Sequence, residues 1–122
     1  MEHSEEFIAI VDDAKGRISE IDVAEALDRI HNGAALIDVR EDSEWSSHAD
    51  GAIHIGRGVL ERDIIGKFPK DAEIILYCGG GFRSALAADM LQKMGYTAVR
   101  SLKGGWKAWQ EAGAPTETEI PF

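Results

Sequence analysis

The hydrophobic positions of this chain fall in short runs that are separated by polar turns. Runs rich in apolar residues occupy positions 34–39, 52–55, 73–77 and 98–102, and each is too short for a buried helix. These runs therefore predict four strands. The run at 73–77 is the clearest, because a Pro-Lys-Asp turn signal comes shortly before it.

Between the predicted strands, apolar residues recur with the period of a helix. Asp22 and Glu25 have the spacing of a capping box, which predicts the start of a helix, and Gly33 is suited to end it in a left-handed conformation. Ser43 is positioned to cap a single turn before the second strand. The buried face of the first of these helices is predicted to consist of Ala26, Leu27 and Ile30, and further helices are predicted at residues 59–65, 84–94 and 106–112.

The first part of the chain differs from the rest in its acidic character. Ser4 can cap a helix there, and its apolar stripe would consist of Phe7, Ile8, Ile10 and Val11. This apolar pattern ends near Gly16. Because its polar face is so acidic, a loosely docked arm is the alternative. The pattern predicts an acidic helix or arm at 1–19, one domain at 20–114 and a tail at 115–122.

The alternation of strands and helices predicts the fold class. It indicates a three-layer α/β/α domain around a mostly parallel sheet of roughly five strands, joined by right-handed crossovers. In such sheets the ligand lies beyond the carboxyl ends of the strands. The residues that follow the strand at 73–77 are therefore the first place to look for chemistry.

Composition narrows the class of protein and its partners. The chain has 122 residues, 44% of them hydrophobic and 29% charged, which is typical of one globular domain. Its 13 basic and 22 acidic side chains give a net charge of −9, which disfavours nucleic acid and anionic membranes as partners. A single cysteine excludes an internal disulfide. With no signal segment or membrane-spanning run in view, we expect a cytoplasmic monomer.

The one cysteine begins the stretch Cys78-Gly-Gly-Gly-Phe-Arg83-Ser84, which runs from the clearest strand into a helix. Three glycines let the backbone turn tightly and direct several N–H groups to one place. The helix dipole and the planar donors of Arg83 add positive potential there. A sulfur in that position is stabilised as a thiolate, which suits a nucleophile or a persulfide. One cysteine without neighbouring ligands does not suit a metal.

Two other interpretations of this stretch are weaker. A lone cysteine at a strand end is usually an inert buried residue, but here the glycines, the arginine and the helix start all serve one pocket. Cysteine phosphatases have a similar loop, with five residues between cysteine and arginine, whereas only the four residues from Gly79 to Phe82 intervene here. The shorter ring has room for a sulfur atom on the cysteine rather than for a phosphoryl group.

Taken together, four motifs make residues 21–113 resemble a single-domain rhodanese. Each motif alone is weak, but four in this order are specific. They are Leu36-Ile-Asp38-Val-Arg40 with Glu44 and Trp45, the stretch from His48 to Ile55, the loop from Cys78 to Arg83, and Leu102-Lys-Gly104-Gly105-Trp106-Lys-Ala-Trp109.

The resemblance implies transfer of sulfane sulfur through a persulfide. Cys78 would take sulfur from thiosulfate or a persulfide donor and pass it to cyanide or a thiol, on a small molecule or a protein, without a cofactor. Arg83 would stabilise the anion. Gly79, Gly80, Gly81, Phe82 and Ser84 would complete the loop, with the Phe82 ring at the pocket mouth. A sulfur relay or a partner-binding module is the alternative, and a small cysteine phosphatase is a weaker one.

Some residues around this pattern are harder to assign. The loop has no cation besides Arg83, so a second clamp for an anionic donor would come from Arg57 or Arg62. Asp38 and Arg40 end a strand on the same side as Cys78, and we expect Arg40 to pair with Glu44 and hold the loop. The remaining candidates are interpreted as structural: His48 and His54 as turn or surface residues, and Trp106 and Trp109 as core anchors.

Overall fold

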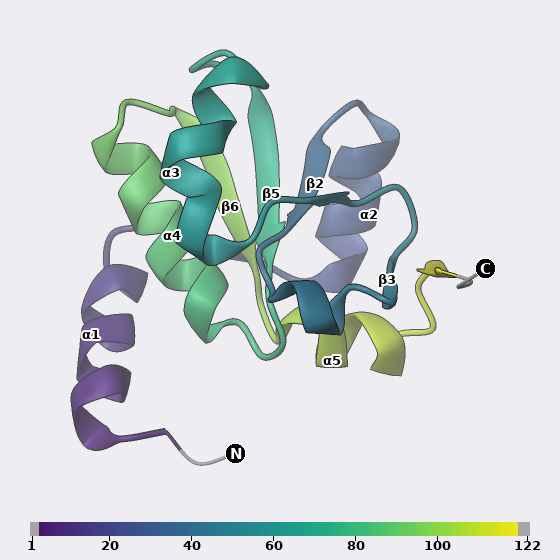
Figure 1. Ribbon diagram of the computed structural model, residues 1–122, viewed down its shortest axis with the longest axis horizontal. Coiled ribbons are helices and arrows are strands. Elements are labelled where there is room, and N and C mark those ends of the chain that lie inside the picture. The colour runs from purple at the N-terminus through teal and green to yellow at the C-terminus, as the bar shows by residue number, and fades with distance from the viewer. Residues whose placement is uncertain (1–2, 120–122) are drawn as a thin grey trace.

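Five parallel strands form the central sheet of the computed structural model, which describes residues 3–119 (Figure 1). The four strands that the hydrophobic runs predict are all present, and a short edge strand joins them. In spatial order the strands are β1 (Ser19–Ile21), β6 (Ala98–Leu102), β5 (Glu73–Tyr77), β2 (Ala35–Asp38) and β4 (Ile53–His54).

Helices cover both faces of this sheet, as the three-layer prediction requires (Figure 1). Helices α3 and α4 pack on one face, and α2 and α5 pack on the other. Short 3₁₀ turns at Asp42–Glu44, Arg57–Val59 and Ile64–Gly66 complete the connections. The helices are α1 (Glu5–Lys15), α2 (Val23–His31), α3 (Leu60–Asp63), α4 (Phe82–Lys93) and α5 (Gly105–Glu111).

Side-chain alternation along β5 explains why the core has two halves. Ile74 and Leu76 belong to the cluster under α3 and α4, whereas Ile75 and Tyr77 belong to the cluster under α2 and α5. All four side chains are fully buried. A strand buried on both faces holds its carboxyl end rigidly, and Cys78 follows directly.

The predicted start of α2 is confirmed, but only half of the capping box forms. The carboxylate of Asp22 accepts a hydrogen bond from the Glu25 backbone N–H at 2.8 Å. Glu25 turns instead to Arg29, whose Nε lies 2.7 Å from its carboxylate. Leu27 was predicted to be buried and is 37% exposed, whereas the helix buries Val23 and Ala26.

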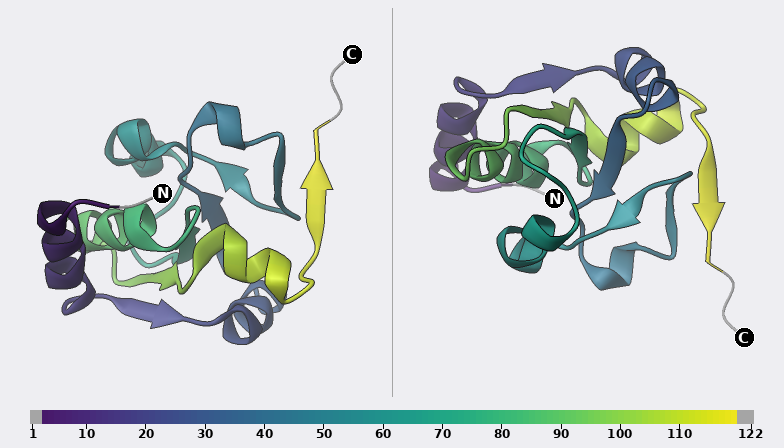
Figure 2. Two further views of the ribbon diagram at one scale, coloured as in Figure 1. Left: turned by 90° about the horizontal axis from the view of Figure 1, so that it is seen from below. Right: turned by 90° about the horizontal axis from the view of Figure 1, so that it is seen from above.

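The acidic N-terminal segment is a docked helix rather than a loose arm. Ser4 Oγ caps α1 by accepting from the Phe7 N–H at 3.1 Å, as predicted. Both views of Figure 2 show α1 lying along α4. The buried side chains are Val11 and Ala14, so the predicted stripe is wrong at Ile8 and Ile10, which are 38% and 58% exposed.

A second, two-stranded sheet lies apart from the central one. Strand β3 (Ser47–Ala49) pairs in antiparallel fashion with β7 (Thr116–Thr118), so the segment predicted as a tail contributes a strand. None of the helices within residues 3–119 is long and apolar enough to cross a membrane.

Candidate active site

The sulfur of Cys78 lies inside the loop that follows β5. Cys78 is 1% exposed, and its Sγ accepts backbone N–H groups from Gly81 at 3.1 Å and Ser84 at 3.3 Å. The hydroxyl of Ser84 lies 3.5 Å from the sulfur and 2.8 Å from the hydroxyl of Ser101. Gly81 is the one glycine of the run whose N–H is within hydrogen-bond distance of the sulfur, and Ser84 supplies the second donor. Two N–H donors aimed at one sulfur suit an anion there.

The N-terminus of α4 is part of this arrangement. Gly81 is the N-cap and has a φ of 98°, a left-handed conformation that glycine adopts without strain. The helix begins at Phe82, two residues earlier than the sequence predicts, because the cap falls inside the glycine run. This start directs the positive end of the helix dipole to Cys78.

Helix α5 holds the loop from the opposite side. The backbone N–H of Trp106 donates to the carbonyl of Cys78 at 2.7 Å, and that of Lys107 donates to the carbonyl of Gly79 at 3.1 Å. A Cβ on Gly105 would overlap the Cys78 carbonyl. Gly104 and Gly105 at the start of α5 thus let the helix approach the Cys78 loop closely.

Arg83 pairs with Glu44, the carboxylate that was predicted to pair with Arg40. Its Nη1 lies 2.9 Å from Glu44 Oε1 and its Nη2 lies 3.2 Å from Oε2. The guanidinium holds the pKa of Glu44 below its usual range, and the carboxylate raises the pKa of Arg83. Glu41, rather than the predicted Ser43, caps the turn, and its N–H donates to Glu44 at 2.9 Å.

Arg40 forms a different ion pair, so its predicted pairing with Glu44 is wrong. Its guanidinium binds both carboxylate oxygens of Asp38 at 2.8–3.1 Å, and both side chains are buried. The hydroxyl of Tyr77 donates to Asp38 at 2.7 Å, and burial raises the pKa of this tyrosine. The guanidinium lies 4.9 Å from the ring of Trp106. These buried side chains support the carboxyl ends of β2 and β5, next to the Cys78 loop.

A cavity of about 820 Å³ opens above Cys78. Arg83 and Lys107 are the cations that line it within the described residues, and sequence reasoning missed Lys107 because only the fold brings α5 to the loop. The two arginines considered as a second clamp are engaged elsewhere: Arg57 lies 2.6 Å from Glu61, and Arg62 lies 2.7 Å from Asp63. Phe82 lines the cavity, and so do Glu41, Glu44 and Gly80.

His48 departs most from its expected position, because it is 1% exposed rather than at the surface. Its Nδ1 lies 2.7 Å from the Trp45 carbonyl, and its ring stacks on Trp45 at 3.4 Å. Its Nε2 and the carboxylates of Glu117 and Glu119 form the one group in residues 3–119 whose atoms are close enough to hold a metal ion. Both glutamates are more than half exposed, and none of the three lines the cavity over Cys78.

A parallel α/β sheet followed by a cysteine that accepts two backbone N–H groups is an arrangement suited to sulfur or anion chemistry. The chain belongs to the rhodanese-like domain family, whose pattern matches residues 22–112.

Relatives of known name point to sulfur transfer. The chain is 37% identical over 120 residues to the probable adenylyltransferase/sulfurtransferase MoeZ of Mycobacterium tuberculosis, covering 91% of this chain and 30% of that protein. The chain therefore spans less than a third of the length of these curated relatives. Family and relatives together support a sulfur-transfer role.

Two solved structures resemble nearly the whole chain. One is the polysulfide-sulfur transferase homodimer of Wolinella succinogenes, with a TM-score of 0.82, 26% identity, and coverage of 93% of this chain and 88% of that one. The other is a protein of unknown function from Rhodopseudomonas palustris, described as a possible tyrosine phosphatase. It has a TM-score of 0.81 and 31% identity, and covers 96% of this chain and 98% of that one.

Proposed function

We propose that this protein transfers sulfane sulfur from thiosulfate or a persulfide to a thiophilic acceptor through a persulfide on Cys78. The thiolate attacks the outer sulfur of thiosulfate, the Sγ–S bond forms, and sulfite leaves with the electron pair of the broken S–S bond. The acceptor then attacks the outer sulfur of the persulfide. Cyanide would leave as thiocyanate, and the electron pair of the Sγ–S bond would return to Cys78 as a thiolate.

The position of the Cys78 sulfur carries this proposal. The N–H groups of Gly81 and Ser84 point at Sγ, and the cavity opens directly above it. Such donors stabilise the thiolate that begins the cycle and the thiolate that the second step regenerates. Arg83 lines the same cavity and offers its charge to an anionic donor, although Glu44 offsets that charge in the resting protein.

Intact mass spectrometry tests both half-reactions. The protein is incubated with thiosulfate without reductant, freed of the donor, and then mixed with cyanide. We expect the mass to rise by one sulfur atom and to return as thiocyanate appears. The variant Cys78→Ser should keep its fold and gain no sulfur, whereas Arg83→Ala should load more slowly. Sulfur transfer by the Cys78→Ser variant would show that the central assignment is wrong.

The alternatives predict different results. A sulfur relay would load Cys78 and lose that sulfur to excess cyanide once, but it would not turn over thiosulfate and cyanide repeatedly. A phosphatase, the role suggested for the Rhodopseudomonas palustris neighbour, would hydrolyse aryl phosphates in a reaction that Cys78→Ser abolishes. With only four residues between Cys78 and Arg83, we expect no such hydrolysis.

A further inference from the structure

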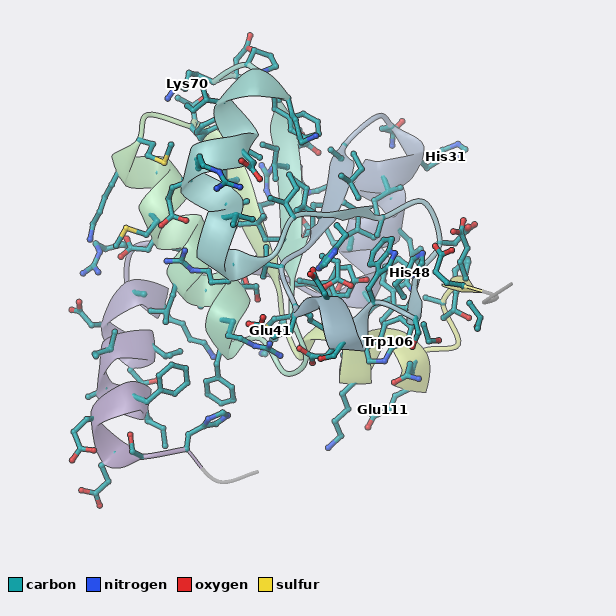
Figure 3. All side chains as sticks on the ribbon, in the orientation of Figure 1. His31, Glu41, His48, Lys70, Trp106 and Glu111 are labelled. Carbon is teal, nitrogen blue, oxygen red and sulfur yellow. The ribbon has the colours of Figure 1, made fainter. Side chains whose placement is uncertain are left out.

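The N-terminal helix contributes to the cavity although it lies outside the part of the chain that the family pattern matches. The family match begins at residue 22, whereas His3 and Phe7 line the cavity over Cys78. Their rings and that of Phe82 gather at its mouth. The ring centroids are 4.5 Å apart for His3 and Phe82, 5.0 Å for His3 and Phe7, and 6.3 Å for Phe7 and Phe82. Figure 3 shows ring side chains filling the space between α1 and the start of α4.

Other contacts already attach α1 to the domain, so the rings are not needed for that attachment. Val11 and Ala14 are buried in the later turns of the helix. Just beyond its end, Arg17 binds both oxygens of Asp89 at 3.0 and 2.8 Å, and its carbonyl accepts from Gln92 at 2.9 Å. His3 and Phe7 lie at the opposite end, just before α1 and in its first turn, and Phe82 begins α4. Phe7 and Phe82 are only half buried, so part of each ring is left to contact a ligand.

The cavity therefore has an apolar wall beside its charged one. Of its charged groups, Arg83 and Glu44 neutralise each other at 2.9 Å. Cyanide and thiosulfate are too small to occupy about 820 Å³ and to contact Cys78 and the rings at once. Aromatic faces bind apolar groups and sulfur well. A thiol with a flat apolar body would fill both parts of the cavity.

We propose that His3, Phe7 and Phe82 form an acceptor subsite that selects small apolar thiols, a proposal that rests on the sulfur-transfer function above. The acceptor thiolate attacks the outer sulfur of the Cys78 persulfide, with its apolar body against the rings. The new S–S bond forms as the Sγ–S bond breaks, and the electron pair of that bond returns to Cys78 as a thiolate. The acceptor leaves as a persulfide, so no external oxidant or reductant is required.

The test compares two acceptors on protein that carries a preformed Cys78 persulfide. Phenylmethanethiol supplies a flat apolar body, cyanide supplies none, and quenched mass spectrometry gives a second-order rate constant for each. The substitution Phe7→Ala should lower the ratio of the phenylmethanethiol constant to the cyanide constant about tenfold, equivalent to about 1.4 kcal/mol. Phe7→Tyr retains the ring and should restore the ratio. Ile10→Ala, on the same helix but 58% exposed and not among the residues that line the cavity, is the matched control and should leave the ratio unchanged.

The possible outcomes distinguish failure of the acceptor subsite from failure of the sulfur-transfer function. A folded Phe7→Ala protein with an unchanged ratio would overturn the subsite. Failure of the unsubstituted protein to take up sulfur on Cys78 would instead overturn the sulfur-transfer function. If Phe7→Ala does not fold, phenylmethanol replaces the variant as a probe, because it has the same body and no thiol. It should slow discharge of the unsubstituted protein by phenylmethanethiol, and absence of inhibition would also contradict the subsite.

Discussion

At the scale of single residues, the buried pair of Asp38 and Arg40 shows how polar groups support the Cys78 loop without lining its cavity. Arg40 donates to both Asp38 oxygens and, at 2.8 Å, to the Ser47 carbonyl. Tyr77 donates its hydroxyl to Asp38 and accepts from the Ala49 N–H at 3.1 Å. Because Asp38, Arg40 and Tyr77 are all buried, loss of one of them leaves a buried charge or a buried polar group uncompensated.

We expect Arg40→Met to lower the free energy of unfolding by about 3 kcal/mol, because it leaves the Asp38 carboxylate buried without its cation. Arg57→Met is the control, since Arg57 pairs with the more exposed Glu61 and its loss should change stability by less than about 1 kcal/mol. Urea denaturation of both variants checks the difference. Equal stabilities would show that the buried pair contributes no more than the exposed one.

Two features require glycine at position 105: a positive φ and a close backbone contact. Gly113 has only the first of them, so it allows the two effects to be measured separately. Gly105 and Gly113 both have positive φ angles, 54° and 69°, so alanine is strained at either position. A Cβ at Gly113 meets nothing within 4 Å, whereas one at Gly105 would overlap the Cys78 carbonyl and lie 2.9 Å from the Gly79 carbonyl. We therefore expect Gly113→Ala to cost about 1 kcal/mol and to leave sulfur loading intact.

Gly105→Ala should cost about 3 kcal/mol or more, because α5 or the loop must move. It should also slow the loading of Cys78 at least about tenfold, since the N–H donors around the sulfur would shift. Loading rates by mass spectrometry and unfolding curves measure both effects. If the two alanine variants load equally fast, the close approach of α5 has no bearing on catalysis.

At the scale of elements, the docking of α1 depends on an ion pair that titrates. The Arg17 guanidinium lowers the pKa of Asp89, which is 5% exposed, below the ordinary carboxyl value of 3.8. A carboxyl whose pKa is lower in the folded protein adds stability above its unfolded pKa and loses it as pH falls through the folded value. This contribution is therefore complete at pH 7, begins to decline at about pH 4, and is lost as the pH falls through the lower folded pKa.

Asp89→Asn should lower the thermal unfolding midpoint by several degrees at pH 7, and the difference from the unsubstituted protein should shrink as the pH is lowered below about 4. Asp13→Asn is the matched control, because Asp13 also pairs with Arg17, at 2.9 Å, but is 71% exposed. Calorimetry across this pH range measures both. A difference that persists unchanged at low pH would show that packing, rather than the ion pair, is what Asp89 supplies.

The same scale shows which elements the sequence could predict. Strands β5 and β6 match their hydrophobic runs, because a buried parallel strand needs apolar residues on both faces. Strands β1, β3 and β7 have three residues each, and β7 is wholly exposed, so no run marks them. The Cys78 loop was evident from its own residues, whereas the partner of Glu44, and the place of Lys107 and His3, depend on segments brought together by the fold. Arg40 pairs with Asp38, only two residues away, and this local ion pair was open to sequence reasoning.

At the scale of the whole molecule, net charge and local charge act on an anionic donor in opposite directions. The chain carries −9 at pH 7, which repels thiosulfate at long range, whereas Arg83 and Lys107 line the cavity and attract it at short range. Because Glu44 largely neutralises Arg83, we expect the long-range repulsion to dominate the encounter. Salt screens charges over a Debye length of about 10 Å at 0.1 M, so it should weaken this repulsion.

The rate constant for loading Cys78 from thiosulfate should therefore rise about threefold between 10 and 150 mM sodium chloride. Discharge by 2-mercaptoethanol is the control: its attacking thiolate carries one negative charge against the two of thiosulfate, so its rate constant should change less over the same range. Stopped-flow loading followed by mass analysis measures the two constants. A loading rate that falls with salt would mean that the cavity cations, and not the net charge, guide the donor, and Lys107→Gln should then abolish that dependence.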